Sequence, residues 1–355
     1  MSVLEFTGMH HGTLFLPKAT LPDCWCSILE ESEYRKYLRK REMKVEDVEN
    51  AVTTVKELEA NLKANGKTFE SATVSDLKQY ISSSISDGSN TEDRIIALTR
   101  YFWMTKRNDL YTYFVGIVGG RGVYISIGER LGKLEGVAKR GEVFDGFKPP
   151  PLGSPPEAYP ACTKELLSRL SASLPPEEVK KVLAGNHHRI PAEGFAEMKK
   201  RYENAETMEA FLAGEHQHLI AELENAMKAG RLWYEQTITP EVVEYVKKDQ
   251  TIQNGMLVGD RVLKSKIPFA PDKWLAEKDP KMRRYYSCHC QLAREAILND
   301  TSKPLGTFCY CSAGYEKFPL EVVLGVPLEV EVLENVLDGG ERCRFAVKIP
   351  RDKIK

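Results

Sequence analysis

Apolar residues recur at helical spacing along the first third of the chain. Residues 45–62 carry valines and leucines three or four positions apart, which predicts an amphipathic helix. The Asn-Gly pair at 65–66 is typical of a helix end. Residues 73–81 and 91–102 repeat the pattern, each behind a Thr, Ser or Asn residue that can cap a helix. We therefore expect residues 36–115 to be helical.

The periodicity changes along the rest of the chain. Residues 161–250 again show helical spacing, whereas residues 259–269 alternate as a strand does. Residues 326–333 and 342–349 alternate as well, and the Leu-Asp-Gly-Gly sequence at 337–340 is typical of a hairpin turn. The pattern predicts an α+β fold, in which a helical N-terminal module precedes a C-terminal α+β unit with an antiparallel sheet.

Two segments interrupt these patterns. The glycine-rich residues 115–128 lack both the Gly-Lys-Ser/Thr of a phosphate loop and the strand-then-helix glycine fingerprint. They predict a tight turn between apolar segments, and no nucleotide cofactor. The proline-rich residues 148–160 predict a stiff linker. We expect an N-terminal segment at 1–35, a helical module at 36–147, this linker, and a domain at 161–355.

Composition narrows the class of protein. The 355 residues are 28% charged and 42% hydrophobic, with a formal net charge of −1, as in soluble globular chains of two or three domains. Near-neutrality argues against a broad nucleic-acid or membrane surface. The sequence has no apolar run of roughly 18 residues, and no signal-peptide pattern at its start. We therefore expect a cytoplasmic protein with free or metal-bound thiols.

Five of the eight cysteines fall in the last quarter of the chain. They are Cys288, Cys290, Cys309, Cys311 and Cys343. In extended chain, a Cys-x-Cys pair directs both sulfurs to one face, so the two pairs could converge on one ion or one pocket. A short helix expected from residue 291 would place the first pair at a helix N-terminus, where thiolates are favoured. A second helix is expected from Tyr315 to Leu324.

Other cysteines and histidines carry weaker signals. Cys24 and Cys26 flank Trp25, which favours two half-buried thiols over a ligand or redox pair. His187-His188 and His216-Gln-His218 have spacings of one and two, whereas histidines that share a helix face are three or four apart. We expect surface or capping roles for these histidines, with a ligand or catalytic role as the alternative.

The C-terminal residues resemble a known family. The matching pieces are Cys309-x-Cys311-Ser-Ala-Gly-Tyr315, Gly325-x-Pro-Leu-Glu-Val-Glu-Val and Gly340-Glu-Arg-Cys343-Arg-Phe345. They are similar to the 4-vinyl reductase domain, and to the related bacterial family of L-2-amino-thiazoline-4-carboxylic acid hydrolase-like proteins. Residues 266–269 and 284–290 fit the same pattern. The resemblance implies an α+β module that binds a small molecule.

The same resemblance implies a zinc site. Sensors of the 4-vinyl reductase type hold zinc through cysteines and a glutamate, and the matching positions here are Cys309, Cys311, Cys343 and Glu331, with Glu334 as an alternative. One cysteine of the sensors has no counterpart at the matching place. Cys288 or Cys290 would then complete a tetrahedral set.

A second resemblance concerns the helical module. Residues 36–115 resemble, by pattern alone, the helical core-binding domain of tyrosine recombinases. No Arg…His-x-x-Arg…Tyr set follows this stretch, so recombination is not implied. We expect a structural or partner-binding role, and we do not expect nucleic acid as a partner.

These observations together predict a cytoplasmic small-molecule enzyme. The expected reaction is hydrolysis of a C–N bond in a small cyclic amidine or amide, by a thiolate or by zinc-bound water. The expected catalytic residues are Cys288, His289 and Cys290, with His289 or a histidine on a helix as the base. The expected substrate-binding residues are Arg283, Arg284, Tyr285, Tyr286 and Tyr315, and Arg294 adds positive potential nearby.

Three alternatives remain at the level of sequence. The chain could be a non-enzymatic sensor of a small molecule or metal, or a scaffold or DNA-associated protein acting through residues 36–115. The cysteines could also be inert, buried core thiols. An exposed hairpin edge at residues 326–333 would suit a homodimer.

Overall fold

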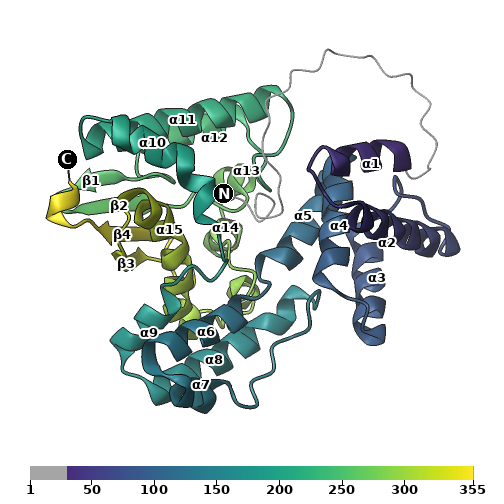
Figure 1. Cartoon of the computed structure of the whole chain (residues 1–355), viewed down its shortest axis with the longest axis horizontal. Helices are drawn as coiled ribbons and strands as arrows, with labels where there is room; N and C mark the ends of the chain where they lie inside the picture. The colour runs from purple at the N-terminus through teal and green to yellow at the C-terminus, as the bar shows by residue number, and fades with distance from the viewer. Residues whose placement is uncertain (1–29, 355) are drawn as a thin grey trace. The chain divides into compact units, whose positions relative to one another are not determined.

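The structure is a computed structural model that describes residues 30–354 (Figure 1). The chain forms two compact units. Among the described residues, the first contains residues 30–119 together with Pro151–Pro155, and the second contains Gly120–Pro150 and residues 156–354. The Cys24–Cys26 pair lies outside the described residues.

This division differs from the boundary expected at residues 148–160. The second unit already begins after Gly119, because Ile127 and Leu131 pack with Leu166 in one hydrophobic core. The Pro151–Pro155 segment belongs to the first unit, where a Cβ atom at Gly153 would lie 2.5 Å from the Ile81 side chain. Residues 151–155 of the predicted stiff linker therefore belong to the first unit, and the residues on either side of them belong to the second.

The first unit is helical, as the sequence predicted. Its helices are α1 (Glu31–Arg39), α2 (Val45–Ala64), α3 (Val74–Asp87), α4 (Glu92–Met104) and α5 (Asn108–Gly119). The valines and leucines of α2 from Val48 to Leu62 are buried, whereas Val45 at its start is exposed, and Phe102 of α4 is also buried. Thr73 caps α3 and forms a reciprocal capping box with Asp76, which confirms the predicted start of that helix.

Residues 120–122 of the glycine-rich segment form the tight turn predicted from the sequence, and the rest of the segment lies in the two flanking helices. The turn separates α5 from α6 (Val123–Glu135). Gly122 takes a left-handed conformation with φ of +67° directly before α6. This backbone conformation strains residues with a Cβ atom, which explains a glycine here without any phosphate-binding role.

The second unit combines helices with a small sheet. Its α-helices after α6 are α7 (Val137–Phe144), α8 (Tyr159–Ser173), α9 (Pro176–Leu183), α10 (Ala196–Asn204), α11 (Met208–Lys228), α12 (Pro240–Lys247), α13 (Pro271–Ala276), α14 (Pro280–Ser287) and α15 (Cys309–Leu324). Short 3-10 turns include η4 (Arg294–Ile297) and η5 (Lys303–Phe308). None of the helices within residues 30–354 is long and apolar enough to cross a membrane.

The strands form one antiparallel sheet in the order β1-β2-β4-β3 (Figure 1). They are β1 (Met256–Val258), β2 (Arg261–Ser265), β3 (Glu329–Glu334) and β4 (Arg344–Lys348). β3 and β4 pair with Glu331 opposite Ala346, which confirms the predicted hairpin. α15 packs against both of these strands. The sheet and its helices confirm the α+β class.

Candidate functional site

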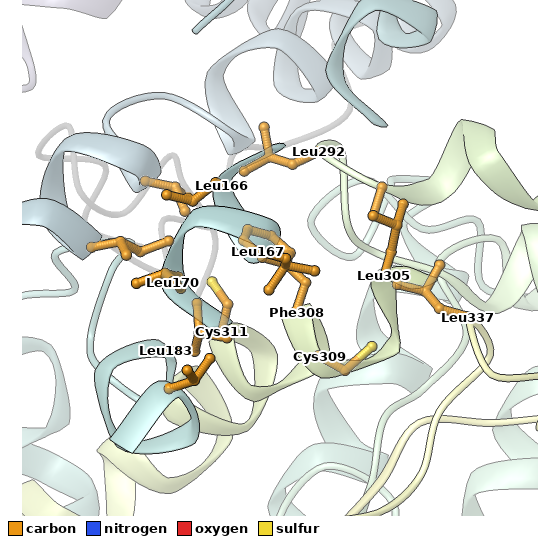
Figure 2. Packing of buried hydrophobic residues seen from close by; sticks show 14 of the residues in the cluster. Leu166, Leu167, Leu170, Leu183, Leu292, Leu305, Phe308, Cys309, Cys311 and Leu337 are labelled. Atoms are coloured by element: carbon orange, nitrogen blue, oxygen red, sulfur yellow. The ribbon is translucent and has the colours of Figure 1, made fainter. Parts of the chain in front are cut away.

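The fold brings the five C-terminal cysteines together. Cys288, Cys309, Cys311 and Cys343 belong to one hydrophobic core, and Cys290 packs against it. Figure 2 shows Cys309 and Cys311 among the leucines of this core. Three segments that are distant in sequence therefore deliver their thiols to one region of the second unit.

The first pair does not lie at a helix N-terminus, so this expectation was wrong. Cys288 is the C-terminal cap of α14, and the chain after Cys290 makes only turns before the short η4. The negative end of a helix dipole disfavours a thiolate at Cys288. Residues 291–298, whose spacing predicted a helix, form turns and the short η4 instead. Leu292, Ala296 and Ile297 are all buried in the core in this conformation.

The second pair is helical and not extended, which also corrects the prediction. Cys309 and Cys311 begin α15, six residues before the expected helix start. Two positions on a helix differ by roughly 200° in direction, so their side chains diverge. Figure 2 shows the two side chains leaving the helix on different sides. The pair therefore cannot chelate one ion as an extended Cys-x-Cys would.

Burial raises the pKa of every described cysteine. The pKa of Cys162 is raised to about 11, and those of Cys290 and Cys311 to about 12. Burial also raises the pKa values of Cys288, Cys309 and Cys343. At neutral pH these groups are therefore thiols, and any nucleophile among them needs a base.

Cys290 differs from the other described cysteines, because it is the one that is not buried. Burial and the neighbouring Cys311 raise its pKa. The backbone N–H groups of Leu292 and Ala293 and the charge of Lys266 act in the opposite direction. Cys290 therefore combines access with groups that stabilise a thiolate once the proton is removed.

A buried ion-pair cluster lies beside the cysteines, and sequence reasoning missed it. Lys264 Nζ lies 3.0 Å from Glu316 Oε2 and donates a hydrogen bond to the Glu316 backbone oxygen at 2.7 Å. Lys266 Nζ lies 3.6 Å from Glu316 Oε1. A spacing of two places both lysines on one side of extended chain, and this was the available signal.

The Glu316 side chain is only 2% exposed. Burial alone would raise its pKa, but the charges of Lys264 and Lys266 hold the pKa below its usual value. Its Oε1 atom has no hydrogen-bond partner among the described residues. The carboxylate therefore stays ionised and keeps one acceptor free for an N–H group.

His289 has a defined tautomer. Its Nε2 lies 2.7 Å from the backbone oxygen of Ile267, and because a carbonyl oxygen only accepts, Nε2 carries the proton. Nδ1 is then left with a lone pair. Burial, followed by the charge of Lys266, lowers the pKa of His289 to about 3, so the ring is neutral. It can accept a proton only transiently.

An arginine stands between two aromatic rings next to this histidine. The Arg294 guanidinium carbon lies 4.5 Å from the Phe269 ring centre and 4.8 Å from that of Tyr285. The Phe269 ring also contacts His289, with ring centres 5.6 Å apart. Tyr285 donates a hydrogen bond to Glu295 Oε1 at 2.8 Å.

Two of the five predicted substrate-binding residues lie beside Arg294 or Lys266, and the other three lie elsewhere. Tyr285 joins Arg294, and Tyr315 lies under Lys266 Nζ, 5.0 Å from the ring centre. Arg283 instead stacks on Trp274 and donates a hydrogen bond to the backbone oxygen of Glu277. The other two residues of α14 also lie elsewhere: Tyr286 faces Lys273, and Arg284 lies near Gly339.

The structure does not assemble the predicted zinc ligands. Glu331 lies on the outer face of β3, where it is exposed and pairs with Arg261 at 2.6 Å. Strand alternation directs Val330 and Val332 to the core and Glu329 and Glu331 outward. Within residues 30–354, no group of three or more His, Cys, Asp or Glu side chains is placed to hold a metal ion.

Two histidines that were expected at the surface are buried. His187 is 1% exposed: its Nε2 donates to the Val182 oxygen, and Ser126 donates to its Nδ1. His216 is buried on the inward face of α11, whereas His218 is exposed and lies 3.2 Å from Glu222. Spacing alone could not distinguish these environments, because neighbouring elements decide which face of a helix is covered.

Comparisons of the chain with protein-family models, with curated proteins and with solved structures give no match.

Proposed function

We propose that the chain is a small-molecule hydrolase that cleaves a C–N bond, with Cys290 as its nucleophile. The observation that carries the proposal is that Cys290, which is partly exposed, lies beside Lys266 and the Leu292 and Ala293 N–H groups. The likeness of residues 309–345 to a small-molecule-binding module supports a small amide or cyclic amidine as the substrate.

The proposed reaction proceeds through an acylated thiol. The Cys290 sulfur attacks the carbon of the C–N bond, and its proton passes to the His289 Nδ1 lone pair. The carbon–nitrogen bond then breaks, and the low pKa of His289 favours release of the proton to the departing nitrogen. Water hydrolyses the carbon–sulfur bond in the second step and restores the thiol.

Two polar groups have roles in this scheme. The free Oε1 of Glu316 accepts a hydrogen bond from a substrate N–H, and so orients an amidine or amide nitrogen. Lys266 lies 3.6 Å from that oxygen and also acts on Cys290, so its charge stabilises the developing thiolate. The geometry therefore suits a substrate with at least one N–H group.

The test is a screen of small amides and cyclic amidines for release of ammonia or amine. We expect a substrate whose turnover falls at least about a hundredfold in Cys290→Ser, a range that mutagenesis of nucleophiles commonly reaches. Cys162→Ser is the matched control, since Cys162 is a buried thiol on α8, and this variant should retain activity. Full turnover by Cys290→Ser would refute the proposed nucleophile.

A specific observation favours a second function, binding without turnover. All described thiols have raised pKa values, which suits a closed ligand site better than a reactive one. A ligand that binds equally to the parent protein and to Cys290→Ser, and is recovered unchanged, would support this sensor-like alternative.

A further inference from the structure

Arg294 is a nearly buried cation without a hydrogen-bonded anion. Its side chain is 13% exposed, and two aromatic rings fix the plane of its guanidinium. Its Nε is buried and has no hydrogen-bond partner among residues 30–354. Glu295 Oε1 lies 3.9 Å from Nε, beyond hydrogen-bond distance, and this oxygen already accepts from Tyr285.

A buried guanidinium N–H without an acceptor destabilises the folded protein unless a ligand supplies the acceptor. A guanidinium offers five N–H donors in a planar fork, and buried donors in folded proteins nearly always have acceptors. The stacked rings hold the fork rigid, so little side-chain freedom is lost when an anion binds. Arg294 is therefore organised to receive a planar, bidentate acceptor.

The charges around Arg294 indicate which anion fits. Three cations, Lys264, Lys266 and Arg294, face the carboxylates of Glu316 and Glu295, and none of these side chains is more than 13% exposed. One positive charge is left over, which matches a monoanion. Glu235 lies within the field of Lys266 and Arg294, and burial raises its pKa, which favours its neutral form.

We propose that Arg294 binds the carboxylate of a small substrate in a bidentate manner, between the rings of Phe269 and Tyr285. The Arg294 backbone N–H donates to the Cys290 oxygen at 2.9 Å, so one turn of chain carries both residues. Phe269 connects Arg294 with His289. This inference deepens the proposed function and rests on it for its catalytic meaning, whereas carboxylate binding is measurable without turnover.

The experiment uses acetate and benzoate as carboxylate probes, benzamide as a neutral isostere, and inorganic phosphate as a competing anion. Binding to the full-length chain is measured by calorimetry and by thermal unfolding. We expect the carboxylates to bind the parent protein and to raise its Tm, and Arg294→Gln to lose at least tenfold in affinity. Arg294→Lys should also bind more weakly, because an ammonium cannot form the planar fork.

Arg189→Gln is the matched control. Arg189 is an exposed arginine that pairs with Glu129, so this variant should bind as the parent does. The ligand-free Tm of Arg294→Gln should not fall, because the change removes a nearly buried cation whose Nε has no hydrogen-bond partner among the described residues. If Arg294→Gln does not fold, the affinity of Arg294→Lys for the carboxylate probes tests the inference, since this variant retains the positive charge.

Several outcomes would overturn the inference. They are the absence of carboxylate binding to the parent protein, equal binding by the Arg294 variants, benzamide binding as tight as that of benzoate, and phosphate binding tighter than either carboxylate. Cys290→Ser separates this inference from the proposed function. If that variant binds benzoate normally while no substrate is found, carboxylate recognition stands and hydrolysis fails.

Discussion

Cys290 and the thiols around it share raised pKa values but differ in access. Burial is the largest cause of the raised pKa of each thiol. Among the described cysteines, only Cys290 combines partial exposure with nearby N–H groups and a lysine. Residue identity alone could not rank these thiols. Their reactivity is therefore best tested one residue at a time.

Alkylation with iodoacetamide should modify Cys290 first. Because its pKa is about 12, the rate should rise roughly tenfold per pH unit from pH 7 to 10 without a plateau. Peptide mass spectrometry at each pH measures this rate, and Cys311, with a similar pKa but a buried side chain, is the internal control. A plateau below pH 8 would contradict the assignment of a raised pKa.

Acid should destabilise the protein through His187. Burial lowers its folded pKa from 6.5 to about 4, so the unfolded state binds a proton more readily. The stabilisation is complete above pH 6.5 and is lost as the pH falls towards 4, by about 3 kcal/mol at most. Urea unfolding at several pH values should show a shallower loss for His187→Asn.

At the scale of elements, α15 organises the second unit. Its first turn places Cys309 and Cys311 in the core. Its middle brings Glu316 to Lys264 of β2 and to Lys266, which follows that strand, and the helix also packs against β3 and β4. Gly314 lets the chain at Ala184 and Gly185 lie directly against the helix. Two predictions follow from these contacts.

Gly314→Ala should destabilise the fold. A Cβ atom there would lie 2.3 Å from the Gly185 oxygen, and a backbone atom cannot move aside cheaply. We expect a loss of about 3 kcal/mol in the free energy of unfolding, measured by chemical denaturation. Gly214→Ala in α11 is the control, because nothing lies within 4 Å of its Cβ position. That variant should be neutral or stabilised by up to about 1 kcal/mol, and equal effects at the two glycines would rule out the steric explanation.

Glu316→Gln should be strongly destabilising. It leaves the charges of Lys264 and Lys266 without their carboxylate in a buried position, and losing one partner of such a group typically costs about 3–5 kcal/mol. Replacing Lys264 by Met in the same protein should recover part of the loss. A double-mutant cycle of unfolding free energies measures the coupling, and strict additivity would show that the pair is not an interacting unit.

At the scale of the whole molecule, zinc content decides between two chemistries. The predicted zinc set stays a prediction, but Glu331 faces solvent and Cys309 and Cys311 diverge. We expect metal analysis of the untagged protein to find zinc far below one equivalent. Near-stoichiometric zinc that disappears in Cys309→Ser and Cys343→Ser would replace the thiol mechanism with metal-assisted hydrolysis or sensing.

The predicted homodimer and the predicted cellular location are also properties of the whole molecule. β3 is an outer strand of the sheet, as the predicted hairpin edge required, and its Leu333 side chain is exposed. The charged side chains of Glu329 and Glu331 alternate along the same strand. Homodimerisation and a cytoplasmic location both stay predictions.

The sequence alone determined α2, α3 and α4 of the first unit, the turn at Gly122, the β3–β4 hairpin and the α+β class. These features follow from periodicity, caps and turn residues, which act over a few neighbouring positions. The tertiary structure alone decided that α15 starts at Cys309, that His187 is buried, and that Lys266, Glu316, His289 and Arg294 lie near Cys290. Burial and electrostatic pairing depend on segments far apart in the chain, and local pattern carries no information about which of them meet.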